Sequence, residues 1–316
     1  MAQTVERGVE QVVGREHWAT KGHPSGAVRL FLWEKYLPSR EGRFAGTVLL
    51  VHGSSMASTP TFDLQVPGRG DEYSVMDCFA RRGYDVWCVD CEGYGRSDKD
   101  RDSNFPIADG ADDCRAAADY IREARGAASL LCYGVSSGAL RAALFAQRNP
   151  GLVSRLALDA FVWTGAGSPT LEQRRKRLPE FLASNRRPID RGFVQSIFNR
   201  DHPGTAEDVV IDAFADAIVA LDDSIPNGTY VDMCQNLPLV DPEQIDCAVL
   251  VTRGEYDGIA GLDDLLEFFK RLPSADKQFI LRPGSAHASI QEKNHAAMLH
   301  GVAAFWSQPA AVYRGS

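Results

Sequence analysis

The sequence has 316 residues, of which 44% are hydrophobic, and its formal net charge is −8. A chain of this length and apolar content can bury a large core, which excludes wholesale disorder and favours one domain with an insertion. The negative charge argues against a general nucleic-acid binder, and no apolar stretch reaches the roughly 20 residues of a membrane span. We therefore expect neither nucleic acid nor a membrane as a partner. Residues 1–7 have neither the basic start nor the apolar core of a signal peptide, which favours a cytoplasmic location.

The seven cysteines are irregularly spaced, and several lie inside predicted strands. This pattern predicts reduced, buried thiols rather than a disulfide framework. Cys88 and Cys91 form a C-x-x-C motif, which binds metal or performs redox chemistry in some proteins, but no second such pair accompanies it. We predict no metal and no cofactor.

Predicted strands and helices alternate along the first half of the sequence. The strands, read from period-two alternation or continuous apolar runs, occupy 27–37, 47–51, 85–90, 130–133 and 153–158. The helices occupy 74–82 and 111–125. The segment 27–37 is typical of one strand of an N-terminal hairpin. Such alternation predicts a doubly wound, mostly parallel sheet, in which ligands bind beyond the carboxyl ends of the strands.

The alternation stops between residues 164 and 239, where helical segments and proline-containing loops occur without a buried strand. It resumes with strands at 248–252 and 278–281 and a helix over 262–272. A terminal helix follows, with an apolar side formed by Ile290, Met298, Val302 and Phe305. We therefore predict an α/β core formed by residues 1–163 and 240–316, with 164–239 inserted as a helical cap.

The segment Gly134-Val135-Ser136-Ser137-Gly138 lies between the strand 130–133 and a helical sequence that begins at Ala139. A Gly-x-Ser-x-Gly motif at a strand-to-helix junction is typical of a nucleophile elbow. The turn is so tight that the positions two before and two after the serine need glycine. The motif alone is weak, but its context makes Ser136 the candidate nucleophile.

Serine is a poor nucleophile without a base. His287 follows the last predicted strand, at the same sheet edge as Ser136, and is the candidate base. A carboxylate must then orient the histidine. Asp257, after the strand 248–252, is the best candidate, with Asp159 and Glu255 as alternatives.

A tetrahedral intermediate carries an oxyanion that needs two hydrogen-bond donors. We expect the backbone N–H of Ser137, directly after the nucleophile, to be one of them. The other is the N–H of Ser54, in the loop after the strand 47–51. His52 starts this loop, and we interpret it as a buried residue that orders the loop rather than as a base.

These residues together resemble the α/β-hydrolase fold family. The motifs that carry the resemblance are His52-Gly53, Asp90-x-x-Gly93-x-Gly95-x-Ser97, the elbow at Ser136, and the chain order Ser136, Asp257, His287. The resemblance spans residues 47–287 and implies an eight-stranded sheet, a helical lid and hydrolysis through an acyl-enzyme. Ser54 follows His52-Gly53 where some esterases of the family have further glycines, so the subfamily stays open.

We expect the cap to determine substrate specificity. It carries Arg174-Arg175-Lys176-Arg177 and Arg186-Arg187, a basic cluster in an acidic protein. The simpler interpretation is a solvated helix face; the alternative is that an arginine such as Arg174 or Arg175 holds a substrate carboxylate. Candidates for an apolar acyl or aryl pocket, or for the core of the cap, are Trp163, Phe193, Phe198 and Phe214.

We predict a serine hydrolase that needs no cofactor and cleaves a small carboxylic ester or lactone through an acyl-enzyme. The same triad also serves carbon–carbon bond hydrolases of the ring-cleavage type, amidases, thioesterases and acyltransferases. Some proteins of this fold keep the triad and only bind a ligand. The sequence does not decide between these alternatives. It also leaves open which acyl and leaving groups the substrate carries and whether the protein forms a homodimer.

Overall fold

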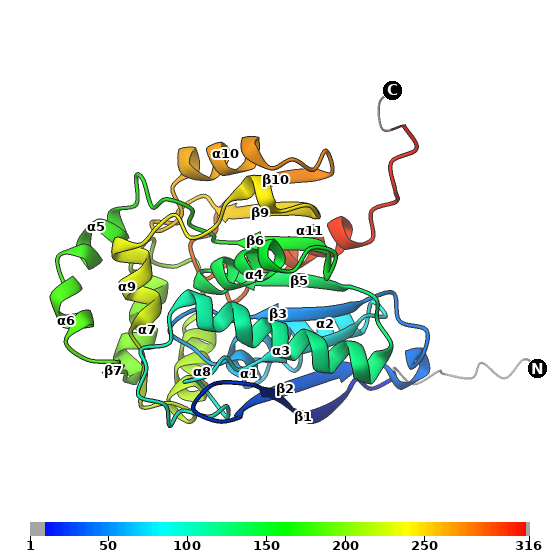
Figure 1. The fold of residues 1–316 in the computed structure, drawn as a ribbon, viewed down its shortest axis with the longest axis horizontal. Coiled ribbons are helices and arrows are strands. Elements are labelled where there is room, and N and C mark those ends of the chain that lie inside the picture. Colours follow the sequence, from blue (N-terminus) through cyan, green and yellow to red (C-terminus); the bar gives the residue numbers. More distant parts are fainter. Residues whose placement is uncertain (1–9, 314–316) are drawn as a thin grey trace, which may run out of the picture.

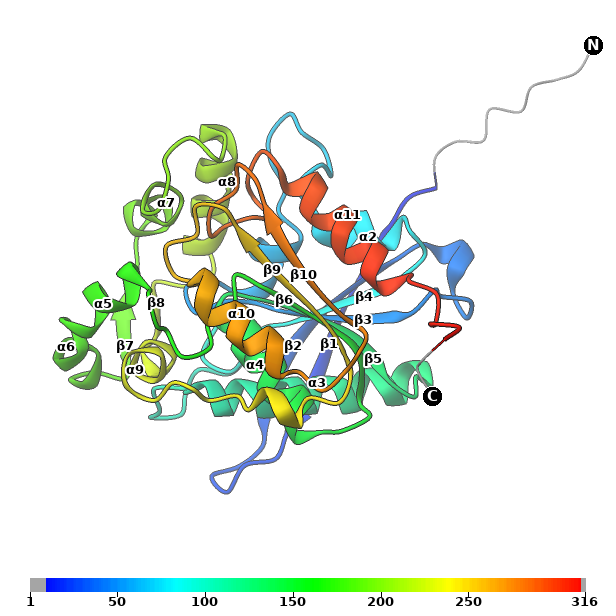
Figure 2. The ribbon, with the colours of Figure 1, turned by 90° about the horizontal axis from the view of Figure 1, so that it is seen from above.

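A computed structural model describes residues 10–313 and is built around an eight-stranded sheet (Figures 1 and 2). Its strands are β1 (Val13–Lys21), β2 (Val28–Tyr36), β3 (Thr47–Val51), β4 (Asp85–Val89), β5 (Leu130–Val135), β6 (Val153–Asp159), β9 (Ala248–Gly254) and β10 (Lys277–Arg282). Their spatial order is β1-β2-β4-β3-β5-β6-β9-β10. The β1–β2 and β2–β4 pairs are antiparallel, and the other pairs are parallel. The predicted doubly wound, mostly parallel sheet is therefore confirmed.

Helices cover both faces of the sheet (Figure 2). One face carries α3 (Ile107–Arg125), α4 (Ser137–Arg148) and α10 (Leu262–Arg271), and the other carries α2 (Val75–Ala80) and α11 (His295–Trp306). Because β3 is covered on both sides, all five of its residues are buried, and its sequence shows no alternation. Shorter elements are α1 (Ser58–Phe62), η1 (Pro38–Arg40) and η2 (Pro242–Gln244).

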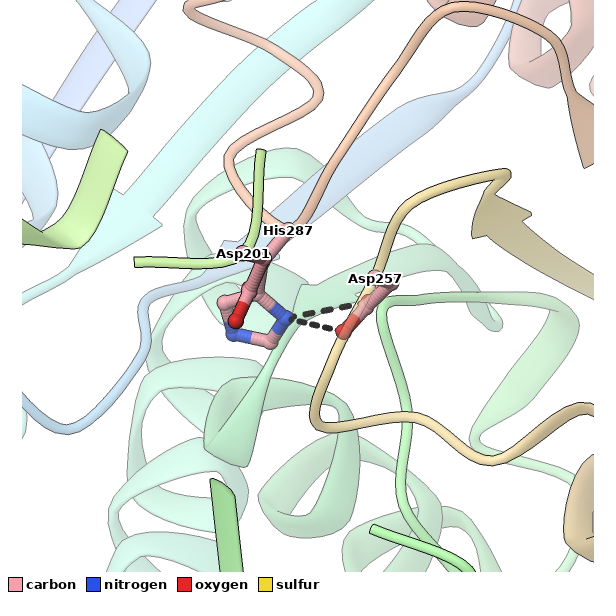
Figure 3. Close-up of side chains that lie close together, drawn as sticks. All are labelled: Asp201, Asp257 and His287. Atoms are coloured by element: carbon pink, nitrogen blue, oxygen red, sulfur yellow. Dashed lines mark hydrogen bonds and ion pairs between the residues drawn. The ribbon is translucent and has the colours of Figure 1, made fainter. Parts of the chain in front are cut away.

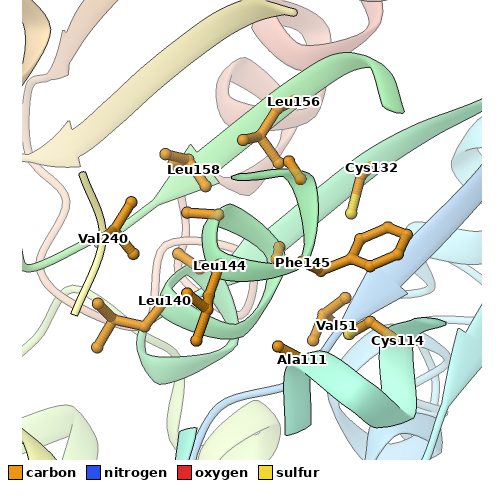
Figure 4. Packing of buried hydrophobic residues seen from close by; sticks show 14 of the residues in the cluster. Val51, Ala111, Cys114, Cys132, Leu140, Leu144, Phe145, Leu156, Leu158 and Val240 are labelled. Carbon is orange, nitrogen blue, oxygen red and sulfur yellow. The ribbon is translucent and has the colours of Figure 1, made fainter. Parts of the chain in front are cut away.

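The packing of α4 on the sheet lies at the centre of the core (Figure 4). Leu140, Leu144 and Phe145 recur at helical spacing and project from α4 into the main apolar cluster. Side chains of β3, β5 and β6 in the same cluster are Val51, Cys132, Leu156 and Leu158. Burial of these side chains fixes the first turn of α4 against the end of β5.

The segment between β6 and β9 lies beyond one end of the sheet (Figure 1). It contains α5 (Pro169–Arg175), α6 (Leu178–Leu182), β7 (Arg186–Pro188), α7 (Arg191–Asn199), α8 (Asp208–Val219), β8 (Ser224–Pro226) and α9 (Gly228–Gln235). We expected no buried strand here, which is wrong: β7 and β8 pair antiparallel, and Ile225 is fully buried. Strands of three residues are too short to show a period of two in the sequence. We call residues 164–239 the cap, and its separation from the core as a domain stays a prediction.

The predicted elements match the observed ones in position and differ at their ends. The helix expected from residue 111 begins at Ile107, and the terminal helix begins at His295, so Ile290 precedes it. Strand β1 was not identified as a separate strand, because only Ala19 and Lys21 of its nine residues are buried. An exposed edge strand gives little apolar signal in the sequence.

Within residues 10–313, no helix is both long enough and apolar enough to cross a bilayer. The prediction based on residues 1–7 concerns a segment outside the described residues. All seven cysteines are free thiols, as predicted. Cys88 and Cys91 are both buried, and this burial raises the pKa of the Cys91 thiol to about 12.

Replacing Phe145 by alanine should destabilise the protein by roughly 3–5 kcal/mol, because the side chain is fully buried and the helix cannot collapse into the space it leaves. Urea unfolding of the variant and the wild type measures the difference. Leu182→Ala is the control, since Leu182 is 57% exposed and its truncation should change the free energy of unfolding by less than about 0.5 kcal/mol. Equal losses in the two variants would contradict the role of α4 packing.

Candidate active site

Ser136 lies between β5 and α4 in a strained backbone conformation, with φ 57° and ψ −126°. A side chain at Gly134 would place its Cβ 2.5 Å from the carbonyl oxygen of Gly138. A side chain at Gly138 would place its Cβ 2.2 Å from the carbonyl oxygen of Val51. Both contacts are with backbone atoms that cannot move aside, so the tight turn needs glycine at both positions, as predicted.

His287, in the loop after β10, joins Ser136 to Asp257. Its Nε2 atom is 2.9 Å from Ser136 Oγ. Its Nδ1 atom is 3.0 Å from each carboxylate oxygen of Asp257, and Figure 3 shows this pair of contacts. A carboxylate accepts hydrogen bonds, which assigns the proton to Nδ1 and leaves Nε2 free to accept from the serine hydroxyl. Three side chains that are far apart in the sequence thus form one hydrogen-bonded chain.

Asp257 is buried in the loop after β9. One of its oxygens also accepts the backbone N–H groups of Ile259 and Ala260, at 2.8 and 3.1 Å. Burial alone would raise the pKa of Asp257, but His287 and these two N–H groups outweigh it and hold the pKa below its ordinary value. The carboxylate therefore stays ionised beside the imidazole.

The two alternative acids are engaged elsewhere. Asp159 accepts hydrogen bonds from the hydroxyl groups of Tyr133 and Ser289, and burial raises the pKa of its carboxyl to about 6. Glu255 is exposed and accepts the backbone N–H of Gly284 at 2.8 Å. Of the three candidates, Asp257 is the one that the structure brings to the ring of His287.

The loop after β3 approaches the serine closely. A Cβ built on Gly53 would lie 3.4 Å from the Cβ of Ser136, which is van der Waals contact, so the loop packs directly against the serine. Ser54 follows directly, and Ser137 is the first residue of α4, where backbone N–H groups have no partner within the helix. Within residues 10–313, neither of these two N–H groups donates to another protein group, so both are available to a ligand.

His52 orders this loop, as we interpreted it. Its ring nitrogens bond to the carbonyl of Gly53 at 2.7 Å and to the backbone N–H of Cys91 at 3.0 Å. Burial, reinforced by the nearby Arg141, lowers the pKa of His52 to about 3. The imidazole is therefore neutral and links the loops that follow β3 and β4.

Tyr94 and Arg141 also hold the loop, and the sequence analysis did not identify either. The Tyr94 hydroxyl donates to the carbonyl of Ser54 at 3.1 Å, and the Arg141 guanidinium donates to the carbonyl of His52 at 3.0 Å. Arg141 is 1% exposed. A single arginine inside the apolar run 139–146 was the available signal, because a buried charge needs specific partners.

Glu292 supports the loop that carries His287. Its carboxylate accepts the backbone N–H of Ala286 at 2.8 Å, and the residue is fully buried. Burial raises the pKa of Glu292 to about 7. This carboxyl group is therefore protonated in part of the molecules at neutral pH.

A cavity of about 540 Å³ opens onto Ser136 and His287. The loop after β3 forms part of its wall, as do side chains of the cap, among them Arg174, Phe193 and Phe214. These three residues show that the cap contributes side chains to the cavity wall.

Three of the proposed pocket residues lie elsewhere. Trp163 belongs to the main core, where its ring N–H donates to the carbonyl of Val240 at 2.9 Å. Phe198 is in the core of the cap and packs edge-on against Phe214 with a centroid distance of 5.6 Å. Arg175 is not part of the cavity wall and donates to the carbonyl of Cys234 at 3.2 Å. Tertiary packing decides whether each of these side chains lines the cavity, and residue type alone does not predict that packing.

Asp201 places a second carboxylate near His287 (Figure 3). One oxygen of Asp201, one of Asp257 and a ring nitrogen of His287 lie within 4.8 Å of one another, as metal ligands would. However, both oxygens of Asp201 accept from Arg200 at 2.9 Å, and Asp257 is bonded to His287. The arrangement fits an ion-pair network better than a cation site. Neither Arg200 nor Asp201 belongs to a recognisable motif, so sequence reasoning missed both.

The sheet order and the serine at the strand-to-helix turn define this protein as an α/β hydrolase. Residues 64–294 match the family described as serine aminopeptidase, S33, and the chain belongs to that family. No curated protein sequence matches the chain.

Solved structures with the same fold include several hydrolases. An esterase from Exiguobacterium antarcticum is 13% identical with a TM-score of 0.68, covering 92% of this chain and 100% of that chain. A thermophilic esterase from Thermogutta terrifontis is 18% identical with a TM-score of 0.63, covering 93% and 100%. A hydrolase from Pseudomonas aeruginosa is 15% identical with a TM-score of 0.66, covering 93% and 99%. At these identities the likeness concerns the fold, and together with the family it makes the protein a serine hydrolase.

Glu292→Gln should flatten the dependence of stability on pH. A carboxyl whose pKa rises from 4.5 to about 7 on folding contributes stability that is present below pH 4.5 and lost as the pH rises to about 7. The loss is on the order of 3 kcal/mol. Between pH 5 and pH 8, urea unfolding should show a loss of stability that is smaller by about this amount in the variant than in the wild type. Glu243→Gln, at an exposed carboxyl, is the control. Equal pH slopes for Glu292→Gln and the wild type would contradict the prediction.

Proposed function

We propose that the protein hydrolyses small carboxylic esters through an acyl-enzyme on Ser136 and needs no cofactor. The observation that carries the proposal is the pair of contacts made by one imidazole, 2.9 Å to the serine hydroxyl and 3.0 Å to the Asp257 carboxylate. A serine held in this way is a nucleophile with its base already in place.

The steps follow from the positions of the donors and acceptors. His287 Nε2 takes the proton of Ser136 as Oγ attacks the ester carbonyl, and Asp257 stabilises the imidazolium that forms. The N–H groups of Ser54 and Ser137 donate to the oxyanion. His287 then protonates the leaving alkoxide, and the ester between Ser136 and the acyl group remains. Water, deprotonated by His287, attacks this ester, releases the acid and restores the serine.

The charge of the cavity favours an ester over a peptide with a free amino terminus. Recognition of an ammonium group needs an unpaired carboxylate in the pocket. The cavity wall includes three arginines (174, 177 and 200), whereas its acidic side chain, Asp201, is already paired with Arg200. Lactones are esters and fit the same mechanism. A comparison of p-nitrophenyl esters with amino-acid p-nitroanilides tests this choice, and preferential cleavage of the anilides would overturn it.

Replacing Ser136 by alanine should lower kcat on the order of 10⁶-fold, because the remaining groups have no nucleophile to activate. Steady-state hydrolysis of the best ester measures the loss. A fluorophosphonate probe should label the wild type at Ser136 and leave the variant unlabelled, as located by mass spectrometry. The assignment fails if the variant keeps more than a tenth of the wild-type turnover.

Asp257→Asn should lower kcat by about 10⁴-fold, because the amide cannot hold the imidazole in the required tautomer or stabilise its charge. Asp159→Asn is the matched control, since this acid is buried at the end of the neighbouring strand but bonds to Tyr133 and Ser289 instead. It should keep kcat within about tenfold of the wild type, a change of less than roughly 1.4 kcal/mol. The reverse order of effects would show that Asp159 is the triad acid.

A further inference from the structure

Two arginines of the cap lie against the ring of one buried tyrosine. Tyr230, on α9, is 6% exposed. The guanidinium carbon of Arg187, from β7, is 3.6 Å from the centre of its ring, and that of Arg174, from α5, is 4.2 Å away. Contacts this short are typical of cation–π interactions. The arrangement concentrates two positive charges in one corner of the cap.

These charges have no acidic partner among residues 10–313. The guanidinium of Arg174 makes no hydrogen bond or ion pair there, and that of Arg187 donates through Nη1 to the carbonyl of Pro226 and the side chain of Asn227. The Nε and Nη2 atoms of Arg187 are buried without a hydrogen-bond acceptor. Buried unpaired donors on a cation are costly, so this corner of the protein favours an anion.

The corner belongs to the same cavity as the triad. Arg174 and Tyr230 both line the cavity that opens onto Ser136. The Tyr230 hydroxyl lies 3.4 Å from the hydroxyl of Ser55, which directly follows Ser54. Bond lengths limit the distance from the Ser54 nitrogen to the Ser55 hydroxyl to roughly 8 Å. One small molecule can therefore reach both the proposed oxyanion donors and the Arg174–Tyr230 corner.

The electrostatics of Tyr230 support the same conclusion. Burial alone would raise the pKa of this phenol, but Arg174 and Arg187, with Ser55 and Arg200, lower it to about 7. A phenol gives up its proton this readily only where the surrounding potential is strongly positive. That potential acts equally on a bound carboxylate.

We propose that Arg174, Arg187 and Tyr230 form a carboxylate-binding subsite, and that the substrate is a small ester carrying one free carboxylate, such as the half-ester of a dicarboxylic acid. This inference rests on the proposed esterase function. The guanidinium of Arg174 meets the carboxylate inside the cavity, and the protonated phenol of Tyr230 donates a hydrogen bond to it. The ester carbonyl then lies between Ser136 and the N–H groups of Ser54 and Ser137.

Matched esters test the subsite. Monomethyl glutarate and its neutral amide counterpart, methyl 4-carbamoylbutanoate, place the charge on the acyl side; 4-acetoxybenzoate and 4-acetoxybenzamide place it on the leaving-group side. We expect kcat/KM to be at least tenfold higher for the acid in one pair. Arg174→Ala should lower that acid-to-amide ratio at least tenfold. Arg175→Ala is the control, because this neighbouring arginine bonds to Cys234 outside the cavity, and it should leave the ratio unchanged.

The outcomes separate this inference from the proposed function. Hydrolysis of acids and amides at equal rates, or a ratio that survives in Arg174→Ala, overturns the subsite and leaves the esterase intact. Absence of both ester turnover and fluorophosphonate labelling overturns the esterase. Calorimetric titration of Ser136→Ala with the acid and the amide of the pair that the wild type distinguishes measures the subsite without chemistry, and at least tenfold tighter binding of the acid is expected. Equal binding of the two would refute the subsite even if Arg174→Ala failed to fold.

The subsite also predicts a pH dependence. The charged groups that surround the Tyr230 phenol are Arg174, Arg187, Arg200 and, more distantly, Arg177. Below pH 7 the phenol is neutral and donates to the substrate; above it, the phenolate neutralises the arginines and repels the carboxylate. The ratio of KM for the acid to KM for the amide should therefore rise severalfold between pH 6 and pH 8.5. Tyr230→Phe should abolish this rise, whereas an unchanged rise would exclude Tyr230 from the subsite.

Discussion

The backbone of Ser136 is held in a conformation that residues with a side chain rarely adopt, and the rest of the site is arranged around it. The turn closes because β3, β5 and α4 approach so closely that Gly138 has no room for a Cβ beside the carbonyl of Val51. The apolar face of α4, buried on the sheet, supplies the stabilisation that offsets this strain. The result is a hydroxyl lifted from the end of β5 and aimed at the ring of His287.

The sheet and the meeting of Ser136 with His287 could be predicted, because both depend on the order of strands and loops along the chain. Ser136 and His287 follow predicted strands, and the carboxyl ends of parallel strands meet at one edge. The carboxylate that meets His287 was less certain, because Asp159 ends β6 and Asp257 follows β9, the neighbouring strand of the sheet. The two carboxylates differ in their hydrogen-bond partners. The hydroxyl groups of Tyr133 and Ser289 donate to Asp159, and no spacing in the sequence predicts these contacts.

The cap was harder to predict, since its elements are short and their orientation depends on packing. Arg174 and Arg175 are adjacent on α5, and successive residues of a helix point about 100° apart, so one faces the cavity while the other does not. A helix of seven residues has too few apolar positions to predict which of the two arginines faces the cavity. Tyr230 was missed for a related reason: its surroundings come from three separate cap segments.

Arg141 connects the helix that starts at Ser137 to the loop that contains Ser54, through the carbonyl of His52. Ser136 and both proposed oxyanion donors are therefore held together by residues of the sheet core, whereas the three arginines of the cavity wall come from the segment between β6 and β9. The proposed chemistry thus depends on residues of the sheet core, and the proposed choice of substrate depends on the cap. Substitutions in the cap can therefore change the substrate that we propose without replacing any of the three side chains of the hydrogen-bonded chain, Ser136, His287 and Asp257.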